Sequence, residues 1–361
     1  MSDATIVETQ TQVNPAEYYE SLTQANVIPL WKLAESQQTE PKPEELGYVW
    51  HYKQLQPLLQ QSVDVVQVGA GAERRAITFK NPGRRFVGAT HSLVASLQML
   101  MPGEIAPAHR HSYSALRFML SGSGAYTVVD GEPVDMEVGD LVLTPNWKWH
   151  DHGHRGGAEP MVWLDGLDFP FVNSLRPIFY EEADGPQQVT QRVGLSLNSY
   201  GNGVVMPTKG RAGVGALFSP LAIYKWRPAY EALKRLHETH QDDFDGAMVE
   251  YVNPINGGHV LATMAAYLQL LAPQQHTKAH RHTQSTVYCV ARGSGYSVIN
   301  GQRHDWEQND IFVVPTWAWH EHVAGDDEVV LFSYSDLPML EPFGFVRDEV
   351  YAENNGRQVV A

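Results

Sequence analysis

Two sets of three histidines are the residues of this sequence best suited to chemistry. Within each set, two histidines stand two residues apart and a third follows later in the chain. The sets are His109, His111 and His150, and then His280, His282 and His320. Residues i and i+2 of a β-strand point to the same face, so each close pair can present two imidazoles side by side. If the strand carrying the third histidine returns beside the first, three nitrogen ligands converge as in a divalent-metal site.

The chain contains the same unit twice, which argues against a chance arrangement. Residues 107–124 (PAHRHSYSALRFMLSGSG) match 278–295 (KAHRHTQSTVYCVARGSG), and residues 139–152 (GDLVLTPNWKWHDH) match 309–322 (NDIFVVPTWAWHEH). The matched blocks keep their order and, to within one residue, their separation, as expected of a duplicated fold. A lone histidine is usually a surface or satisfied core residue, whereas this triplet occurs twice. The sequence predicts metal binding in at least one copy and leaves the second copy open.

The elements that must position these histidines are short antiparallel strands. The segments Leu93–Met101, Ala125–Val129 and Leu141–Thr144 are apolar or β-branched and are separated by turn residues. Asn300-Gly301 and its counterpart Asp130-Gly131 are two-residue hairpin signals. Many short strands at regular spacing favour a mainly β sandwich or barrel.

Helical signals lie outside the two repeats. Asn14, Pro15 and Glu17 read as an N-cap, a first-turn proline and a capping-box partner. Apolar residues at helical spacing after Pro228 predict a second helix within residues 225–240. Helices are therefore expected in the N-terminal segment and in the connector between the repeats.

Composition narrows the classes of partner. The 361 residues suggest about two domains. Lys plus Arg number 26 against 41 Asp plus Glu, and a net charge of −15 argues against nucleic acid or an anionic membrane surface as a partner. A single cysteine, Cys289, excludes an intramolecular disulfide and fits a reducing cytoplasm. We see no signal peptide and no apolar stretch long enough to span a membrane.

The histidine blocks resemble the two sequence motifs of the bicupin family. Gly103, His109, His111 and Gly122 match the first motif, and Gly139, Pro145 and His150 match the second, with Trp147 in place of a glycine. The second copy matches with Gln274 and Asn309 in place of two glycines. The resemblance implies two cupin domains, each a double-stranded β-helix or jelly roll. The predicted division is a helical and extended segment (1–84), a first, catalytic cupin (85–175), a connector (176–254), a second cupin (255–345) and a tail (346–361).

The departure from the cupin motif concerns its glutamate ligand. Ala115 occupies the place of the glutamate in the first copy, and Thr286 occupies it in the second. Three neutral ligands leave a divalent ion its full charge and open positions, which suits an anionic chelating substrate together with O2. Zinc also binds three histidines, so the ligands alone do not identify the metal.

Within the cupins, this pattern resembles gentisate 1,2-dioxygenases and their salicylate and 1-hydroxy-2-naphthoate relatives. The flanking segments agree: Leu97-Gln98, Pro102-Gly103-Glu104, Trp149-His150-Asp151-His152 and Trp163-Leu164-Asp165-Gly166-Leu167-Asp168. The resemblance implies an Fe(II)-dependent extradiol-type dioxygenase that uses O2 to cleave an aromatic hydroxy acid between its carboxyl- and hydroxyl-bearing carbons. Gentisate to maleylpyruvate is the first expectation, and salicylate, 5-substituted salicylates and 1-hydroxy-2-naphthoate remain open. The family's habit also implies a homotetramer.

Candidate substrate contacts cluster around the first triplet. Arg117 lies an even number of residues past His111, so on an unbroken strand it faces the ligand side and offers an anchor for a carboxylate. Val287 or Tyr288 stands at its place in the second copy, which makes the first copy the expected site of catalysis. The resemblance implies further substrate contacts by Arg74 and Gln98. His152 and Asp165 are candidate catalytic groups for hydrogen bonding or proton transfer.

Val94 and Ser96 are candidate pocket residues that bear on the substrate. Relatives often carry an aromatic residue at the place of Val94 and a smaller residue at that of Ser96, so this chain has room for a substituted or bicyclic ring. Two other functions agree less well with these residues. A manganese oxalate decarboxylase-like bicupin would need the missing glutamates, and a non-catalytic metal- or ligand-binding bicupin would be expected to have lost its histidines.

Overall fold

The computed structural model describes residues 13–33, 39–68, 74–203, 207–208 and 216–361. The chain divides into two compact units, Met1–Lys42 and Pro43–Ala361. The first unit holds helix α1 (Pro15–Gln24) and the 3-10 turn η1 (Leu30–Lys32). The side chain of Asn14 accepts a hydrogen bond from the backbone N–H of Ala16 (3.0 Å), as its position before Pro15 predicts. The start of the chain, where the sequence predicts no signal peptide, lies outside the described residues.

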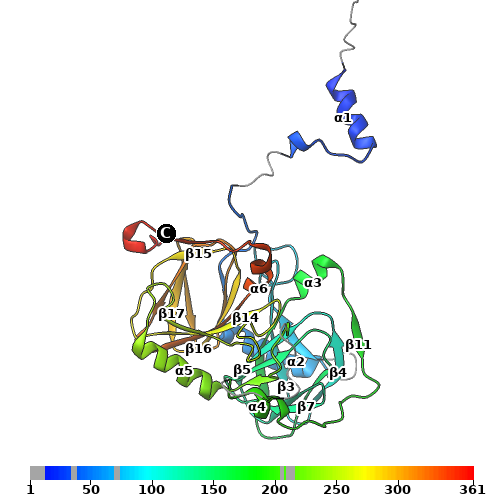
Figure 1. Cartoon of the computed structure of the whole chain (residues 1–361), viewed down its shortest axis with the longest axis vertical. Helices are drawn as coiled ribbons and strands as arrows, with labels where there is room; N and C mark the ends of the chain where they lie inside the picture. The colour runs from blue at the N-terminus through cyan, green and yellow to red at the C-terminus, as the bar shows by residue number, and fades with distance from the viewer. Residues whose placement is uncertain (1–12, 34–38, 69–73, 204–206, 209–215) are drawn as a thin grey trace, which may run out of the picture. The chain divides into compact units, whose positions relative to one another are not determined.

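The second unit is built from two cupins, each with a six-stranded and a five-stranded antiparallel sheet (Figure 1). The first cupin has the sheets β12-β8-β5-β10-β3-β2 and β11-β4-β9-β6-β7, and the second has β1-β19-β16-β21-β14-β13 and β18-β17-β20-β15-β22. The predicted mainly β fold with two cupins is therefore confirmed. No helix in the described part of the chain is long and apolar enough to cross a membrane.

The strands of the first cupin are β2 (Arg75–Thr78), β3 (Val94–Leu100), β4 (Ile105–His111), β5 (Ala115–Ser121), β6 (Ala125–Val129), β7 (Glu132–Asp135), β8 (Leu141–Thr144), β9 (His150–His154), β10 (Met161–Leu167), β11 (Tyr180–Glu182) and β12 (Ile223–Tyr224). Those of the second are β1 (Tyr48–Trp50), β13 (Ala247–Glu250), β14 (Ala265–Leu271), β15 (His280–His282), β16 (Thr286–Arg292), β17 (Ser294–Ile299), β18 (Gln302–Glu307), β19 (Ile311–Val314), β20 (His320–Ala324), β21 (Val329–Ser335) and β22 (Asp348–Val350).

The predicted hairpins are present. Asn300 and Gly301 have φ values of 49° and 77° and join β17 to β18, while Asp130 and Gly131 have φ values of 47° and 81° and join β6 to β7. Positive φ at both central residues is the geometry of the tight turn whose twist matches that of the strands.

Helices cover and connect the cupins. They are α2 (Tyr52–Val65), α3 (Phe169–Leu175), α4 (Leu195–Tyr200), α5 (Trp226–Thr239) and α6 (Leu337–Leu340). Leu59 of α2 and Leu233 of α5 are buried in the core, so each of these helices turns an apolar residue inward. Helix α5 confirms the helix predicted within residues 225–240.

Segments outside the two repeats complete both large sheets. Strand β1, from the N-terminal segment, pairs with β19 of the second cupin. Strand β12, from the connector, pairs with β8 of the first cupin. The added strands cover edges that would otherwise present unpaired backbone groups, so the two cupins are completed by segments that chain order places before the first repeat and between the repeats.

The core lies where the two six-stranded sheets meet. Phe118 of β5 stacks on Phe332 of β21 with ring centroids 4.1 Å apart and planes 3° from parallel. Gly166 of β10 permits the close approach, because a Cβ there would meet the ring of Tyr334 at 2.7 Å. The hydroxyl of Tyr334 donates to the carbonyl of Val94 (2.7 Å) across the same interface. Alternate residues of these strands face either this shared core or the interior of their own cupin.

A half-buried histidine outside the triads predicts a pH-dependent contribution to stability. His259 lies between Glu250 (Nδ1 to Oε1, 2.5 Å) and Glu341 (Nε2 to Oε2, 2.9 Å), and the Glu250 hydrogen bond chiefly raises its pKa to about 9. The protonated form is stabilised by folding, so its contribution is complete below the unfolded pKa of about 6.5 and is lost as pH rises through about 9. We expect His259→Asn to lower the free energy of unfolding by about 1 kcal/mol at pH 6, after allowance for solvent screening.

Denaturant unfolding of the wild type and His259→Asn at pH 6 and pH 10 measures this contribution. The difference between the two proteins should largely vanish at pH 10. A destabilisation of equal size at both pH values would show that His259 acts through packing and not through its charge.

Candidate active site

The first histidine triad is assembled by two antiparallel strands. His109 of β4 lies directly opposite His150 of β9, and His111 follows two residues along β4 on the same face. The ring centroids are 4.2 Å apart for His109 and His150, 4.8 Å for His111 and His150, and 5.5 Å for His109 and His111. One ring nitrogen from each lies within 4.8 Å of the others. The structure therefore brings together the three side chains that the sequence selects.

Backbone carbonyls set the tautomer of each ring. The Nδ1–H groups of His109, His111 and His150 donate to the carbonyls of Pro107 (2.8 Å), Tyr113 (2.6 Å) and Lys148 (3.0 Å). The Nε2 lone pairs are thereby left for another partner, which for His109 is a guanidinium nitrogen of Arg74. Within the described residues, Nε2 of His111 and Nε2 of His150 are buried with no hydrogen-bond partner. Orphaned, inward-facing nitrogens of this kind fit a divalent metal ion.

The three imidazoles are held neutral, as metal ligands must be. Burial, with the nearby Arg74 guanidinium as the next cause, lowers the pKa of His109 to about 2. Burial lowers the pKa of His111 to about 3 and that of His150 well below its ordinary value. No proton therefore competes with a metal ion for these nitrogens near neutral pH.

A buried ion pair lies on the large sheet facing the triad. Asp165 of β10 stands between Ser96 of β3 and Arg117 of β5 in the strand register. The Nε of Arg117 lies 3.0 Å from Oδ1 of Asp165, and an Nη1–H of Arg117 donates to the hydroxyl of Thr144. Arg117 is 1% exposed, which excludes a surface salt bridge. Burial lowers the pKa of Arg117 to about 10, so it stays cationic at neutral pH.

Asp165 makes a second contact besides its ion pair. Besides its pairing with Arg117, its Oδ1 accepts a hydrogen bond from Nε1 of Trp163 (3.1 Å). Burial raises the pKa of Asp165, and the charge of Arg117 opposes this rise. The carboxylate therefore contacts Arg117 and Trp163.

Gln98 and His152 carry buried polar atoms inside the first cupin. Both side chains are 0% exposed. Among the described residues, neither the amide atoms of Gln98 nor the ring nitrogens of His152 have a hydrogen-bond partner. The His152 ring lies 5.9 Å from that of His150 and 5.5 Å from that of Trp163, between centroids. Buried polar atoms without partners are costly, so these groups are placed to meet a bound molecule.

Val94 and Ser96 lie on the same strand as Gln98. Their even spacing along β3 puts the three side chains on one face. Ser96 donates its hydroxyl to Oγ1 of Thr78 (2.9 Å), while Val94 is 7% exposed. Both residues are therefore part of the buried wall formed by β3.

The four arginines of the upstream segment have different roles. Arg75 pairs with Glu104 (2.8 Å) and Arg84 with Glu45 (2.8 Å), so both are structural. The guanidinium of Arg85 lies 5.8 Å from the centroid of the Phe86 ring. Arg74 contacts the ring nitrogens of His109 and is the member of this group that reaches the triad.

Two aromatic neighbours of the triad escaped the sequence analysis. Tyr113 stacks on His111 with centroids 3.7 Å apart and planes 9° from parallel, and Tyr180 of β11 stacks on His109 at 5.4 Å and 18°. Tyr113 stands two residues past His111, and this spacing in the sequence could have indicated that the two side chains lie close together. Tyr180 has no local signal, because the pairing of β11 with β4 joins distant parts of the chain.

The second triad repeats the geometry of the first. His280 of β15 lies opposite His320 of β20. The centroid distances are 4.3 Å for His280 and His320, 4.8 Å for His282 and His320, and 5.6 Å for His280 and His282. One ring nitrogen of each again lies within 4.8 Å of the others. The described chain therefore holds two candidate metal centres.

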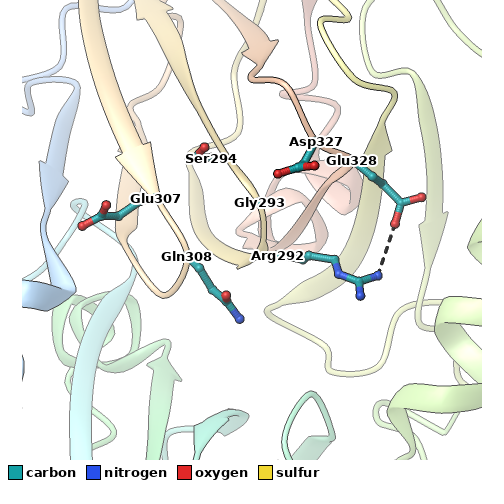
Figure 2. Close-up of a pocket in the computed structure, with 7 residues that line it drawn as sticks. All are labelled: Arg292, Gly293, Ser294, Glu307, Gln308, Asp327 and Glu328. Atoms are coloured by element: carbon teal, nitrogen blue, oxygen red, sulfur yellow. Dashed lines mark ion pairs between the residues drawn. The ribbon is translucent and has the colours of Figure 1, made fainter.

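A separate surface hollow is unrelated to either triad. Figure 2 shows its lining, in which Arg292 forms an ion pair with Glu328 (3.5 Å). The hollow includes Ser294, which begins strand β17. His320 pairs with Ile299, which ends the same strand. It therefore opens at the end of the second cupin opposite its histidines.

Comparisons with known proteins agree with this geometry. The cupin domain family matches residues 96–166 and 267–334. The chain is 38% identical over 336 residues to "Gentisate 1,2 dioxygenase 1" of Aquipseudomonas alcaligenes, covering 92% of this chain and 95% of that protein. It is 36% identical over 355 residues to "5-aminosalicylate 1,2-dioxygenase" of Comamonas sp, covering 95% and 92%. A salicylate 1,2-dioxygenase structure from Pseudoaminobacter salicylatoxidans with gentisate superposes with a TM-score of 0.87 at 33% identity, covering 96% and 97%.

Proposed function

The chain belongs to the bicupin family of ring-cleaving 1,2-dioxygenases, and from this premise we propose that its first cupin cleaves gentisate to maleylpyruvate with Fe(II) and O2. The observation that carries the proposal is the juxtaposition of His109, His111 and His150 with two arginines, Arg74 and Arg117. Three neutral ligands and two guanidinium groups make a site in which an anionic chelating substrate balances the charge.

The metal supplies one part of the chemistry and the chain supplies the rest. Bound Fe(II) provides the redox chemistry that joins O2 to an electron-rich ring. His109, His111 and His150 would hold the ion through their ring nitrogens. Alternative metals such as zinc fit three histidines as well, so metal analysis belongs to the test.

Arg117 and Arg74 are proposed to bind the substrate carboxylate. A guanidinium presents paired N–H donors that match a carboxylate in geometry and charge. Asp165 acts as a positioning residue, because its contact with Nε fixes the direction in which Arg117 presents its remaining donors. The substrate carboxylate would thereby be held beside the histidine triad.

Gln98 and His152 are proposed to bind the ring hydroxyl groups. Their buried polar atoms have no partner in the described residues, so a substrate hydroxyl can bond to them without displacing another group. Burial lowers the pKa of His152 well below its ordinary value, so its ring is neutral and can accept a hydroxyl proton at one nitrogen. Burial of the whole cup also excludes bulk water from the reacting ring.

The choice among hydroxybenzoates rests on the wall made by Val94 and Ser96. Gentisate is preferred because a similar curated protein bears that name, and the related salicylate enzyme has been solved with gentisate. Salicylate, 5-substituted salicylates such as 5-aminosalicylate, and 1-hydroxy-2-naphthoate are the alternatives for the same chemistry. A valine at position 94, where relatives often carry an aromatic residue, is the feature that supports the larger members of this group as alternatives.

We propose that the enzyme is a cytoplasmic homotetramer, as the family resemblance implies. Its one cysteine, Cys289, is buried and free, which fits a reducing compartment.

Oxygen uptake by the Fe(II)-reconstituted protein tests the function. We expect uptake with gentisate, and a smaller or larger rate with salicylate, 5-aminosalicylate or 1-hydroxy-2-naphthoate will define the substrate range. Val94→Phe is expected to reduce the rate with the bicyclic substrate by about tenfold or more relative to gentisate, because a phenyl group fills the space on that wall.

The control is the same protein stripped of metal and the same protein loaded with Zn(II), both of which should be inactive. Iron-loaded protein that consumes no O2 with any of the four substrates would contradict the proposed function. An equal effect of Val94→Phe on all substrates would show that this wall does not select among them.

A further inference from the structure

The interiors of the two cupins, called here the first and second cups, differ most in the row of residues that faces the histidines. In the first cup, neighbouring strands present Ser96, Asp165, Arg117 and Val142. The corresponding row of the second cup presents Tyr267, Ser333, Tyr288 and Phe312. The cation and its carboxylate partner are therefore both replaced. Nothing in this row of the second cup can anchor a carboxylate by charge.

Aromatic rings also fill the second cup. Tyr288 stacks on Phe312 with centroids 4.7 Å apart, and Trp306 lies 5.9 Å from Phe312. The ring of His322, which stands at the place of His152, lies 5.1 Å from that of Tyr288 and forms a hydrogen bond with the hydroxyl of Ser297 (2.8 Å). The three aromatic side chains are at most 3% exposed. A substrate ring would have to displace this packed cluster.

The charges around the two triads have opposite signs. The guanidinium groups of Arg74 and Arg117 act on the imidazoles of the first triad. Carboxylates act on the second triad: Asp242 and Asp348 on His280, and Asp245 on His282. A divalent cation is repelled by the first set of charges and attracted by the second. Asp165 offsets part of the charge of Arg117, and Asp242 and Asp348 are exposed, so solvent screens part of their attraction.

The second triad nevertheless keeps the features of a metal site. The Nδ1–H groups of His282 and His320 donate to the carbonyls of Gln284 (2.8 Å) and Ala318 (3.1 Å), as in the first cup. His320 is 0% exposed, and its Nε2 has no hydrogen-bond partner in the described part of the chain. A nitrogen so placed faces the other two ligands with nothing else to bind.

We propose that His280, His282 and His320 hold a second divalent metal ion that takes no substrate and is bound more tightly than the ion of the first cupin. The carboxylates of Asp242, Asp245 and Asp348 balance its charge in place of a substrate anion. The first site keeps an excess of positive charge, from Arg74 and the ion, until its anionic substrate binds. The second ion is therefore a permanent structural component, and it fills first when metal is scarce. This assignment does not depend on which aromatic acid the first cupin cleaves.

Titration of the metal-free full-length protein with Mn(II), followed by electron paramagnetic resonance of the free ion, tests the proposal. We expect two ions per chain, the first bound at least tenfold more tightly than the second. His320→Ala should remove the tighter class and leave the weaker one. In a parallel anaerobic titration with Fe(II), ring cleavage should stay near zero until about one equivalent has been added.

Asp245→Asn is the variant that isolates the charge. It should weaken the tighter class by about fivefold or more while both histidine triads remain intact. Asp243→Asn is the matched control, because it removes the same charge two residues away. The Asp243 side chain is exposed and pairs with Lys278 (2.5 Å). The control should leave both affinities as they are.

The wild-type titration is decisive even if His320→Ala fails to fold. A single ion per chain would overturn the proposal, and so would two ions of which the weaker is the one lost with His320. Equal effects of Asp245→Asn and Asp243→Asn would overturn the role of the buried carboxylate. Failure of ring cleavage with two ions bound would instead count against the proposed function alone.

Discussion

Replacing His150 with alanine is expected to abolish ring cleavage, lowering kcat/KM by about 10³-fold or more. His150 lies closest to both partners in the first triad, at 4.2 Å from the His109 ring and 4.8 Å from the His111 ring. Its loss leaves two ligands, which hold a divalent ion weakly and no longer fix the open positions where substrate and O2 meet. The reaction has no other means in the first cup to activate O2.

The measurement pairs oxygen uptake with the metal content of His150→Ala and of the matched variant His320→Ala, which stands at the same place in the second triad. His150→Ala should lose activity and one ion, with its fold intact by circular dichroism. His320→Ala should lose the other ion and keep a rate within severalfold of the wild type. Equal loss of activity in both variants would refute the assignment of catalysis to the first cupin alone.

Arg117→Met is expected to lower kcat/KM by about 10²- to 10³-fold, because a buried guanidinium no longer meets the substrate carboxylate. The same change leaves Asp165 buried without its cation, at 5% exposure, and we expect the free energy of unfolding to fall by about 3 kcal/mol. The two effects have different causes, so a second substitution can separate them.

The double variant Arg117→Met with Asp165→Asn removes the orphaned charge. We expect it to recover most of the lost stability in denaturant unfolding, while kcat/KM stays near that of the single variant. Recovery of activity together with stability would show that Arg117 serves the fold and not the substrate. An unchanged KM for substrate in both variants would likewise count against a carboxylate contact.

Local patterns in the sequence were enough to predict both triads. A period of two places His109 and His111 on one face, and the repeated third histidine indicates a returning strand. The Asn-Gly and Asp-Gly turns, the helix capped by Asn14 and the helix after Pro228 rest on equally local chemistry. Each of these features depends on residues close together in the chain, and the structure contains each of them.

The features that could not be predicted from the sequence depend on contacts between residues far apart in the chain. The sequence placed Arg117 on the ligand face, but its pairing with Asp165 is set by the register of β5 against β10. Tyr180 reaches His109 only because β11 adds to the edge of β4. The aromatic row of the second cup likewise becomes visible only when four strands are aligned. Neither spacing nor residue type reports such registers.

Strands from outside the two repeats make the two halves of this duplicated protein depend on each other. Strand β1 precedes the first cupin in the chain but pairs with β19 of the second cupin. Strand β12 follows the first repeat in the chain but pairs with β8 of the first cupin. The stacked rings of Phe118 and Phe332 join the halves at the centre of one core. A gene fragment encoding the first repeat alone would give a sheet with an open edge and a bare apolar face. The two modules of the duplication have therefore become one unit, in which each half is a folding partner of the other.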